Sequence, residues 1–325
     1  MVALDLSELF PRRAQPVRSL DTATVAALSP EAFLASQFGG GRGDVGAEGN
    51  GDGDLCPRRP APLLLTGGCL AVSRKWAAPG YLAASTQEGL EVDVDVAPPA
   101  SNGYFPDTKA ERAALGIRES TVLFSDLLLD TDDDAPAAAA GNSPRSFPFL
   151  PSPRHYAYLQ QQSWAFDVLF PALAADLRDP ALACPALAGL SGRACAKILW
   201  LGVSPTRSQL HFDRKDNFIC QMCGVKEVLL FGPEQTPRLY QRADADGTSF
   251  TDRFSAMDLN ADDPGRFREA YPLAAAAEPL RAVLRPGDVL FVPRTWWHVV
   301  SSTPDPARRI NIMANMFFER NVDAP

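Results

Sequence analysis

The segment SQLHFDRKDNF, residues 208–218, places His211 two residues before Asp213. In a β-strand, residues i and i+2 face the same side, about 6.6 Å apart along the chain, so the imidazole and the carboxylate can converge on one point. An imidazole and a carboxylate at this spacing suit one divalent cation. A polar pair at the end of a strand would show the same spacing, so a metal site requires a third ligand from elsewhere in the chain.

The third candidate ligand is His298, in the segment LRPGDVLFVPRTWWHVVSS, residues 284–302. The chain has three histidines, and this one follows two tryptophans at the start of an apolar run. A lone histidine at this place could equally be a core residue stacked on Trp297. Two histidines and one aspartate are nevertheless the composition of the facial triad that binds non-haem Fe(II) and leaves coordination positions open. We therefore treat His211, Asp213 and His298 as candidate metal ligands.

The elements that must position these residues are short apolar segments separated by Gly, Pro, Asp and Ser. They span residues 196–204, 208–212, 217–224, 226–233, 282–293, 298–302 and 310–318. Segments of this kind, without alternating helices, predict an antiparallel β-sandwich or barrel, and a jelly roll fits their number. One helix is expected over residues 165–178, where apolar residues recur at helical spacing before an Asp-Pro pair.

The first half of the chain predicts a scaffold without a catalytic motif. Short strands are expected within residues 62–67, 90–97 and 121–128, the last as a strand or a helix start, and a weak helix within 108–117. Two stretches, at about 39–59 and 130–153, are rich in Gly, Asp, Ala and Pro and are expected to be disordered loops. We expect residues 1–153 to form an α+β elaboration that packs on a barrel formed by residues 154–325.

The run HFDRKDNFICQMCGVKEVLLFGPEQTPRLY, followed by LRPGDVLFVPRTWWHVVSS, resembles the JmjC (cupin-like) Fe(II)- and 2-oxoglutarate-dependent oxygenases. The resemblance covers residues 156–318 and is greatest to the small hydroxylase branch that includes the asparaginyl hydroxylase factor inhibiting HIF and the tRNA wybutosine hydroxylase. It implies a mainly β fold with flanking helices, the double-stranded β-helix or jelly roll of the JmjC barrel. It also implies Fe(II) as the cofactor, held by the triad, with 2-oxoglutarate and O₂ as cosubstrates.

The resemblance implies further residues around the cosubstrate. Lys226 matches a lysine whose ammonium makes a charge-assisted hydrogen bond to the distal carboxylate of 2-oxoglutarate. Tyr158 matches a tyrosine whose hydroxyl reaches the same carboxylate, and Ser208 stands where a threonine is more usual, which keeps the hydroxyl but removes a methyl contact. Asn315 and Asn217 match polar positions near the metal-bound end of the cosubstrate.

The activity that the resemblance implies is a dioxygenase reaction, in which decarboxylation of 2-oxoglutarate is coupled to oxidation of a C–H bond. Gln160 and Trp297 are weaker candidates for contact with the substrate. Hydroxylation of a protein side chain is preferred to demethylation of lysine, because the chain shows no reader module, and to hydroxylation of an RNA nucleoside. Two further classes stay open: a cupin enzyme that uses a metal without 2-oxoglutarate, and a non-catalytic cupin-like binding module. The resemblance also makes a homodimer one expected assembly.

Composition narrows the partners and the location. The net charge of -8 and the pI of about 5.0 argue against a broad electrostatic grip on nucleic acid or on an anionic membrane, and so favour a protein or peptide partner. No run approaches the 18 or more apolar residues of a membrane span. The first residues, MVALDLSELFPRR, lack the features of a secretion signal, so a cytoplasmic or nuclear location is expected.

The six cysteines are scattered and do not have the even spacing of a disulfide framework. Cys220 and Cys223 form a CxxC motif within an expected strand, where residues i and i+3 point to opposite faces. No second Cys or His cluster supplies the remaining ligands of a zinc finger. We therefore expect neither a zinc site nor a redox site at this motif.

Overall fold

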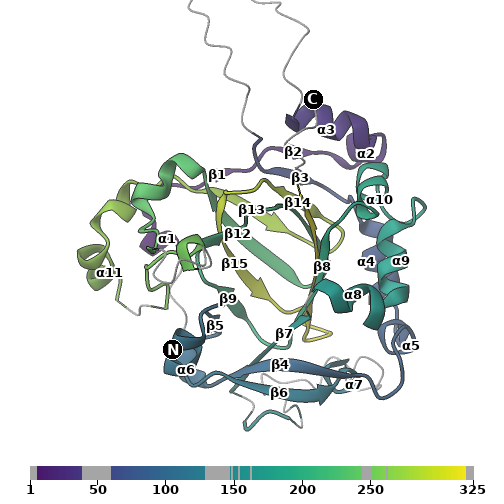
Figure 1. Ribbon diagram of the computed structural model, residues 1–325, viewed down its shortest axis with the longest axis horizontal. Coiled ribbons are helices and arrows are strands. Elements are labelled where there is room, and N and C mark those ends of the chain that lie inside the picture. Colours follow the sequence, from purple (N-terminus) through teal and green to yellow (C-terminus); the bar gives the residue numbers. More distant parts are fainter. Residues whose placement is uncertain are drawn as a thin grey trace, which may run out of the picture.

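The computed structural model describes residues 6–38, 60–128, 147, 149–152, 154–161, 163–243, 251–260 and 263–319. Two β-sheets face each other at the centre of this structure, and helices cover their outer sides (Figure 1). The loops expected at about 39–59 and 130–153 lie outside the described residues, except for residues 147 and 149–152 of the second loop.

The first sheet has seven strands. In spatial order they are β1 (Gln15–Pro16), β13 (Leu280–Leu284), β12 (Val225–Phe231), β15 (Trp297–Thr303), β9 (Thr206–Ser208) and β5 (Tyr104–Phe105), with β10 (His211–Phe212) also paired to β15. The pairings of β9, β10, β12, β13 and β15 with one another are antiparallel. This sheet therefore joins strands from the second half of the chain, with short N-terminal strands at its two edges.

The second sheet has nine strands. Their order is β2 (Ser19–Leu20), β3 (Leu63–Leu65), β14 (Val289–Val292), β11 (Asp216–Cys223), β16 (Asn311–Phe318), β8 (Ala196–Gly202), β7 (Tyr156–Gln161), β4 (Glu91–Ala97) and β6 (Arg118–Leu123). From β14 to β6 every neighbouring pair is antiparallel. The two facing antiparallel sheets confirm the mainly β, jelly-roll class predicted from the sequence.

The alternation of side chains along the strands creates an interior between the sheets and an exterior under the helices. On β15, Val300 packs against the interior cluster that contains Val228 and Leu230, whereas Val299 belongs to the cluster on the outer side of the same sheet. This is the expected consequence of a two-residue period, which sends successive side chains to opposite faces. Inward positions on β15 therefore include those of His298, Val300 and Ser302.

Helices cover the outer face of the nine-stranded sheet. They are α4 (Leu70–Ala77), α5 (Tyr81–Ala84), α8 (Ser163–Leu169), α9 (Pro171–Arg178) and α10 (Pro185–Ser191), together with α2 (Thr22–Ala26), α3 (Pro30–Phe38) and α7 (Phe124–Leu128) nearby (Figure 1). Trp76 and Leu173 from these helices pack with Leu199 of β8 in one large core. None of the helices in the described part of the chain has the length and apolarity needed to cross a membrane.

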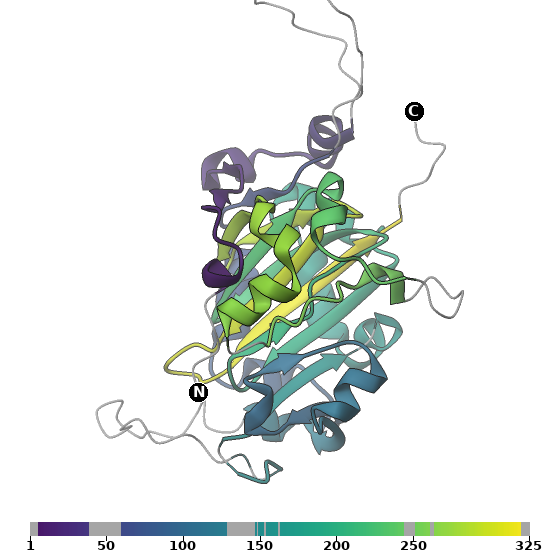
Figure 2. The same cartoon turned by 90° about the vertical axis from the view of Figure 1, so that its left-hand side faces the viewer.

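The outer face of the seven-stranded sheet is covered by α1 (Leu6–Leu9) and α11 (Pro264–Ala270), and α11 lies in front of the strands in Figure 2. The remaining helical elements are α6 (Lys109–Ala114) and the 3₁₀ turns η1 (Pro99–Ser101), η2 (Pro233–Arg238), η3 (Thr251–Arg253) and η4 (Pro272–Ala276). Helices on both outer sides confirm the expected flanking of a β core.

Two local expectations need adjustment. The single helix expected over 165–178 is two helices, α8 and α9, because Pro171 has no N–H to donate to the preceding turn and instead occupies the first position of α9. In the first half of the chain, β4 pairs with β7 and β5 pairs with β9, so this half extends both sheets. The division into units 1–153 and 154–325 stays a prediction.

The CxxC motif departs from regular strand geometry. The register of β11 shifts between Gln221 and Cys223, which marks a β-bulge. Cys220 and Cys223 consequently both face the core under the helices. The expectation that they point to opposite faces was wrong, because the extra residue of the bulge changes the alternation. Among the described residues, neither cysteine belongs to a group that could hold a metal ion.

Candidate metal centre

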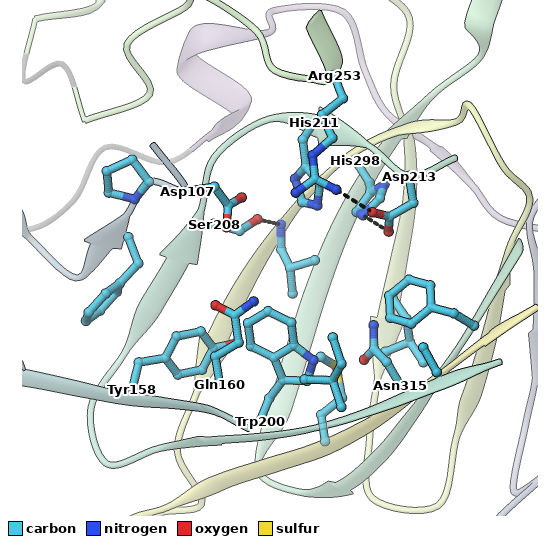
Figure 3. Close-up of a pocket in the computed structure, with 18 of the residues that line it drawn as sticks. Asp107, Tyr158, Gln160, Trp200, Ser208, His211, Asp213, Arg253, His298 and Asn315 are labelled. Atoms are coloured by element: carbon cyan, nitrogen blue, oxygen red, sulfur yellow. Dashed lines mark hydrogen bonds and ion pairs between the residues drawn. The ribbon is translucent and has the colours of Figure 1, made fainter. Parts of the chain in front are cut away.

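The three candidate ligands converge at one end of the space between the sheets (Figure 3). His211 and His298 are direct cross-strand partners of β10 and β15, which brings the centres of their rings to 4.3 Å. Asp213 follows the end of β10, and its Oδ2 lies 3.6 Å from Nε2 of His298. One ligand atom from each residue lies within 4.8 Å of the other two. The structure thus brings together the three residues singled out by the sequence.

Backbone carbonyls orient both imidazole rings. Nδ1 of His211 lies 2.7 Å from the carbonyl oxygen of Gln209, and Nδ1 of His298 lies 3.0 Å from that of Trp296. Donation of the Nδ1 proton to a carbonyl leaves Nε2 with a free lone pair, as in most metal-binding histidines. Burial, with the neighbouring His211 as a second cause, lowers the pKa of His298 to about 4. The neutral imidazole that binds a metal is therefore its ordinary form near neutral pH.

The loop that carries Asp213 is tied to the turn between β14 and β15. The N–H of Thr295 donates to the carbonyl oxygen of Asp213 at 2.7 Å, and the N–H of Arg294 donates to Oδ1 of Asp216 at 2.8 Å. Nη1 of Arg253 lies 3.9 Å from Oδ1 of Asp213. These contacts hold the carboxylate beside the two rings. The donor set, two imidazoles and one carboxylate, therefore fits a divalent metal ion such as Fe(II).

The triad lies on the wall of a cavity of about 440 Å³ between the two sheets. Tyr158, Gln160, Ser208 and Asn315, all expected from the sequence to contact the cosubstrate or substrate, lie on the same wall (Figure 3). Ser208 is tied to the sheet, because its Oγ accepts a hydrogen bond from the N–H of Val300 at 3.0 Å. The cavity thus joins the candidate metal ligands to polar groups from both sheets.

Lys226 lies deeper on the inward face of β12. Its side chain is 1% exposed, its Nζ donates to Oγ of Ser302 at 2.5 Å, and the same atom lies 5.9 Å from the centre of the Tyr158 ring. Ser302 and His298 are both inward on β15 and four residues apart, which corresponds to roughly 13 Å along the strand. Burial lowers the pKa of Lys226 to about 7, and no anion among the described residues offsets the loss of hydration.

Two side-chain amide oxygens near the cavity have no hydrogen-bond partner among the described residues. They are the buried Oδ1 atoms of Asn315 and Asn217. Asn315 lies on the cavity wall, and Asn217 does not. Asn217 nevertheless faces the same side of β11 as Ile219, which is a wall residue. Burial raises the pKa of the Tyr158 hydroxyl, which therefore remains a proton donor. Unpartnered buried amides are unfavourable in a closed core and are what a bound polar molecule would satisfy.

Trp297 does not contact the cavity. It is fully buried on the outer face of β15, packs edge to face on Phe212 with ring centres 4.9 Å apart, and donates from Nε1 to Oγ1 of Thr236 at 2.9 Å. Its neighbour His298 faces the opposite side, as successive strand residues must. The expectation that Trp297 contacts a substrate was therefore wrong.

Trp200 and Asp107 are among the wall residues that sequence reasoning missed. Trp200 of β8 faces the cavity beside Ile198 and lies 5.3 Å from the ring of Tyr158. The alternation in AKILWLG, in which Ile198 and Trp200 share one face, was a signal that could have identified it. Asp107 comes from the segment after β5, and no local pattern in the sequence indicates that it reaches the cavity.

The fold and the triad define a cupin-like protein with a candidate metal centre. The chain belongs to the family of the cupin-like domain, whose model matches residues 57–324. Both sheets lie within this match, apart from the short edge strands β1 and β2.

Three relatives match parts of the chain. One is named for its JmjC domain, one for tRNA wybutosine synthesis and one for lysine demethylation. The chain is 40% identical to Jumonji C domain-containing protein 5 of Drosophila melanogaster over 103 residues, which are 32% of this chain and 24% of that protein. Over 92 residues, 28% of this chain and 25% of the relative, it is 39% identical to tRNA wybutosine-synthesizing protein 5 of Gallus gallus. Over 101 residues, 31% of this chain and 21% of the relative, it is 32% identical to Lysine-specific demethylase 8 of Xenopus tropicalis. The chain therefore matches at most about a quarter of each of these relatives.

A solved structure, that of E. coli ycfD, aligns with 80% of this chain and 50% of its own, at 16% identity and a TM-score of 0.40. A similarity at this level carries no argument about function. The family membership rests on the sequence match over residues 57–324.

Proposed function

We propose that this protein is an Fe(II)- and 2-oxoglutarate-dependent dioxygenase that hydroxylates a protein side chain. The observation that supports it best is an arrangement between the sheets. The His211, Asp213 and His298 triad lies on the cavity wall. Lys226 is not itself a wall residue, but it is buried on an inward strand position of the same sheet, and its Nζ has a hydroxyl partner and no carboxylate partner among the described residues. A divalent cation and a dicarboxylate are the ligands that these two groups would bind.

The chain's own residues would bind and orient the reactants. His211, Asp213 and His298 would hold the metal, with their rings fixed by the carbonyls of Gln209 and Trp296. When bound, Fe(II) would supply the open coordination positions at which 2-oxoglutarate and O₂ react.

The cosubstrate would be positioned by groups deeper in the cavity. Lys226 would hold its distal carboxylate, and the hydroxyl groups of Tyr158 and Ser208 would donate to the same end. The unpartnered amides of Asn315 and Asn217 would contact the end nearer the metal. The apolar wall, which includes Trp200 and Val300, would keep water away from the reacting atoms.

The relatives support an oxygenase of this general kind and leave the substrate open. One is named for tRNA wybutosine synthesis and another for lysine demethylation. A protein side chain is the substrate we favour, because the net charge of -8 does not suit nucleic acid. Oxidation of a carbon attached to a methylated nitrogen would give demethylation at the same site, so lysine demethylation and nucleoside hydroxylation are the alternatives within this chemistry.

The test is an anaerobic titration of the purified protein with Fe(II) and then with 2-oxoglutarate, followed by the visible charge-transfer band of the metal complex. We expect the band in the wild-type protein and no band in Asp213→Ala. The matched control is Asp126→Ala, on α7 outside the cavity, which should keep the band. Mass spectrometry of a turned-over protein substrate then separates the gain of one oxygen atom from the loss of a methyl group.

Other outcomes favour other classes. Bound metal without a band would contradict the use of 2-oxoglutarate and favour a cupin enzyme of another chemistry. Failure of the wild-type protein to bind metal would favour a non-catalytic binding module.

A further inference from the structure

One acidic side chain from the first half of the chain faces the candidate metal centre. Asp107 lines the cavity together with Ser208 and His211, and Figure 3 shows its carboxylate directed into the space beside Ser208. Strand β5 carries the segment there, because it pairs in parallel with β9 and places Phe105 opposite Ser208. The acid is therefore part of the wall that a substrate would contact.

Gln209 fixes the position of this acid. Its side chain is fully buried, and its Oε1 accepts a hydrogen bond from the N–H of Asp107 at 3.4 Å. Its Nε2 donates to Oε2 of Glu111 at 3.3 Å, and Glu111 is also paired with Arg242. The backbone carbonyl of the same residue orients His211. Gln209 thus contacts both the Asp107 backbone and a metal ligand, and it adds to the pairing of β5 with β9 in positioning Asp107.

The cationic side chains of the wall already have acidic partners. The pairs are Arg112 with Asp95, Arg214 with Asp252, Lys215 with Glu319, and Arg253 with Asp213. The carboxylate of Asp107, in contrast, has no ion-pair or hydrogen-bond partner in the part of the chain that the structure describes. A cation entering the cavity would gain an ion pair with this half-buried carboxylate that the described part of the free protein lacks.

We propose that Asp107 selects a cationic substrate side chain, the ammonium of a lysine or the guanidinium of an arginine, which enters the cavity and pairs with its carboxylate. The inference rests on the proposed function for the reaction that follows. The methylene groups of such a side chain would pack on Phe105 and Tyr158, two wall residues whose rings are 5.5 Å apart. The net charge of -8 would also attract basic peptides over a longer range.

The test uses labelled short peptide pools with identical randomised flanks and a fixed central residue, which is lysine, arginine, norleucine or glutamate. Binding to the full-length protein, without metal or cosubstrate, is measured by fluorescence anisotropy. We expect the lysine or the arginine pool to bind about tenfold more tightly than the norleucine pool, the difference of one partly buried ion pair. Asp107→Asn should reduce this ratio to about one, and the control Asp126→Asn should keep it.

Three results would overturn the inference. They are equal or absent binding of all pools to the wild-type protein, a preference for the glutamate pool, and a preference for cations that persists in Asp107→Asn. A labelled single-stranded RNA that binds more tightly than the cationic pools would also contradict it, because it would assign the cavity mouth to a polyanion.

The outcome is separable from that of the proposed function. A preference for cations that depends on Asp107, in a protein that gives no charge-transfer band, would leave the cation site in place and remove the oxygenase. A band without this preference would keep the oxygenase and remove the assignment of Asp107.

Discussion

Two buried lysines lie in opposite regions of this molecule, Lys197 on the outer face of the nine-stranded sheet and Lys226 between the sheets. Lys197 is 5% exposed and Lys226 is 1% exposed. Nζ of Lys197 donates to both carboxylate oxygens of Asp167, at 3.0 and 2.8 Å. Nζ of Lys226 has a hydroxyl partner, Ser302, and no carboxylate partner among the described residues. The two lysine side chains are thus similarly buried, but only the charge of Lys197 is compensated by a carboxylate among the described residues.

The difference separates a structural lysine from one available to a ligand. A buried charge without a counter-ion is costly, so its pKa falls, and that of Lys226 falls to about 7. An anionic ligand would supply the missing partner and restore the ammonium. Lys197 has no such capacity, because Asp167 already neutralises it.

The largest expected effect comes from removing the uncompensated lysine. Lys226→Met should weaken 2-oxoglutarate binding about 100-fold, because the ligand loses a charge-assisted hydrogen bond in a buried site. Lys197→Met is the matched control, a buried strand lysine replaced in the same way, and should change the affinity less than about twofold. Titration calorimetry under anaerobic conditions measures both. Similar losses in the two variants would mean that general destabilisation, and not the missing ammonium, causes the effect.

A second variant removes the difference between the two lysines. Ser302→Asp would give Lys226 the carboxylate partner that Lys197 has, and we expect about 30-fold weaker 2-oxoglutarate binding because the new anion competes with the ligand. Ser302→Ala, which removes the hydroxyl without adding charge, should have a much smaller effect. Unchanged affinity in folded Ser302→Asp, checked by circular dichroism, would contradict the assignment of Lys226 to the ligand.

The pH dependence of 2-oxoglutarate binding follows from the lowered pKa of Lys226. Above pH 7 the free protein loses this proton, whereas the complex retains it, so the affinity should fall with rising pH by up to about tenfold per unit. Lys226→Arg, which stays charged, should flatten the profile measured by calorimetry between pH 7 and 9. The free energy of unfolding changes in the opposite sense. Between pH 7 and the ordinary lysine pKa the unfolded chain binds more protons than the folded one, so stability rises with pH.

The smallest expected effect is that of replacing Lys197, whose charge Asp167 compensates, on the free energy of unfolding. Asp167 is half exposed, so its ion pair with Lys197 is screened by water, and Lys197→Met should change the free energy of unfolding by less than about 1 kcal/mol. Urea denaturation measures this change. A loss greater than about 3 kcal/mol would indicate an ion pair that behaves as fully buried.

Local patterns in the sequence were sufficient for the main strands of the second half of the chain and for the His211 and Asp213 pair, but not for the short strands β1, β2 and β5. The two-residue period places both residues of the pair on one side, and it holds although β10 ends at Phe212. His298 was proposed from the two-histidine, one-aspartate composition of a facial triad and then from the family resemblance. The structure supplies the physical reason for its place, which is its direct pairing with His211 across two strands. Such long-range register is not encoded in a local pattern.

The remaining features depend on contacts between distant segments. Asp107 reaches the cavity only because β5 pairs with β9, about a hundred residues further along the chain. Cys220 and Cys223 share a face because of a β-bulge, and no residue type in this segment predicts the bulge. Trp297 was expected to contact the substrate, although the two-residue period that directs His298 inward directs its neighbour outward.

The central claim is that one cavity combines a metal-binding triad with a lysine for the far end of a dicarboxylate. The most direct test is an anaerobic crystal structure of the protein with Mn(II), as a redox-stable substitute for Fe(II), and 2-oxoglutarate. We expect Mn(II) bound by His211, Asp213 and His298, with the distal carboxylate of 2-oxoglutarate on Nζ of Lys226. A metal ion bound elsewhere, or 2-oxoglutarate bound without contact to Lys226, would contradict the account.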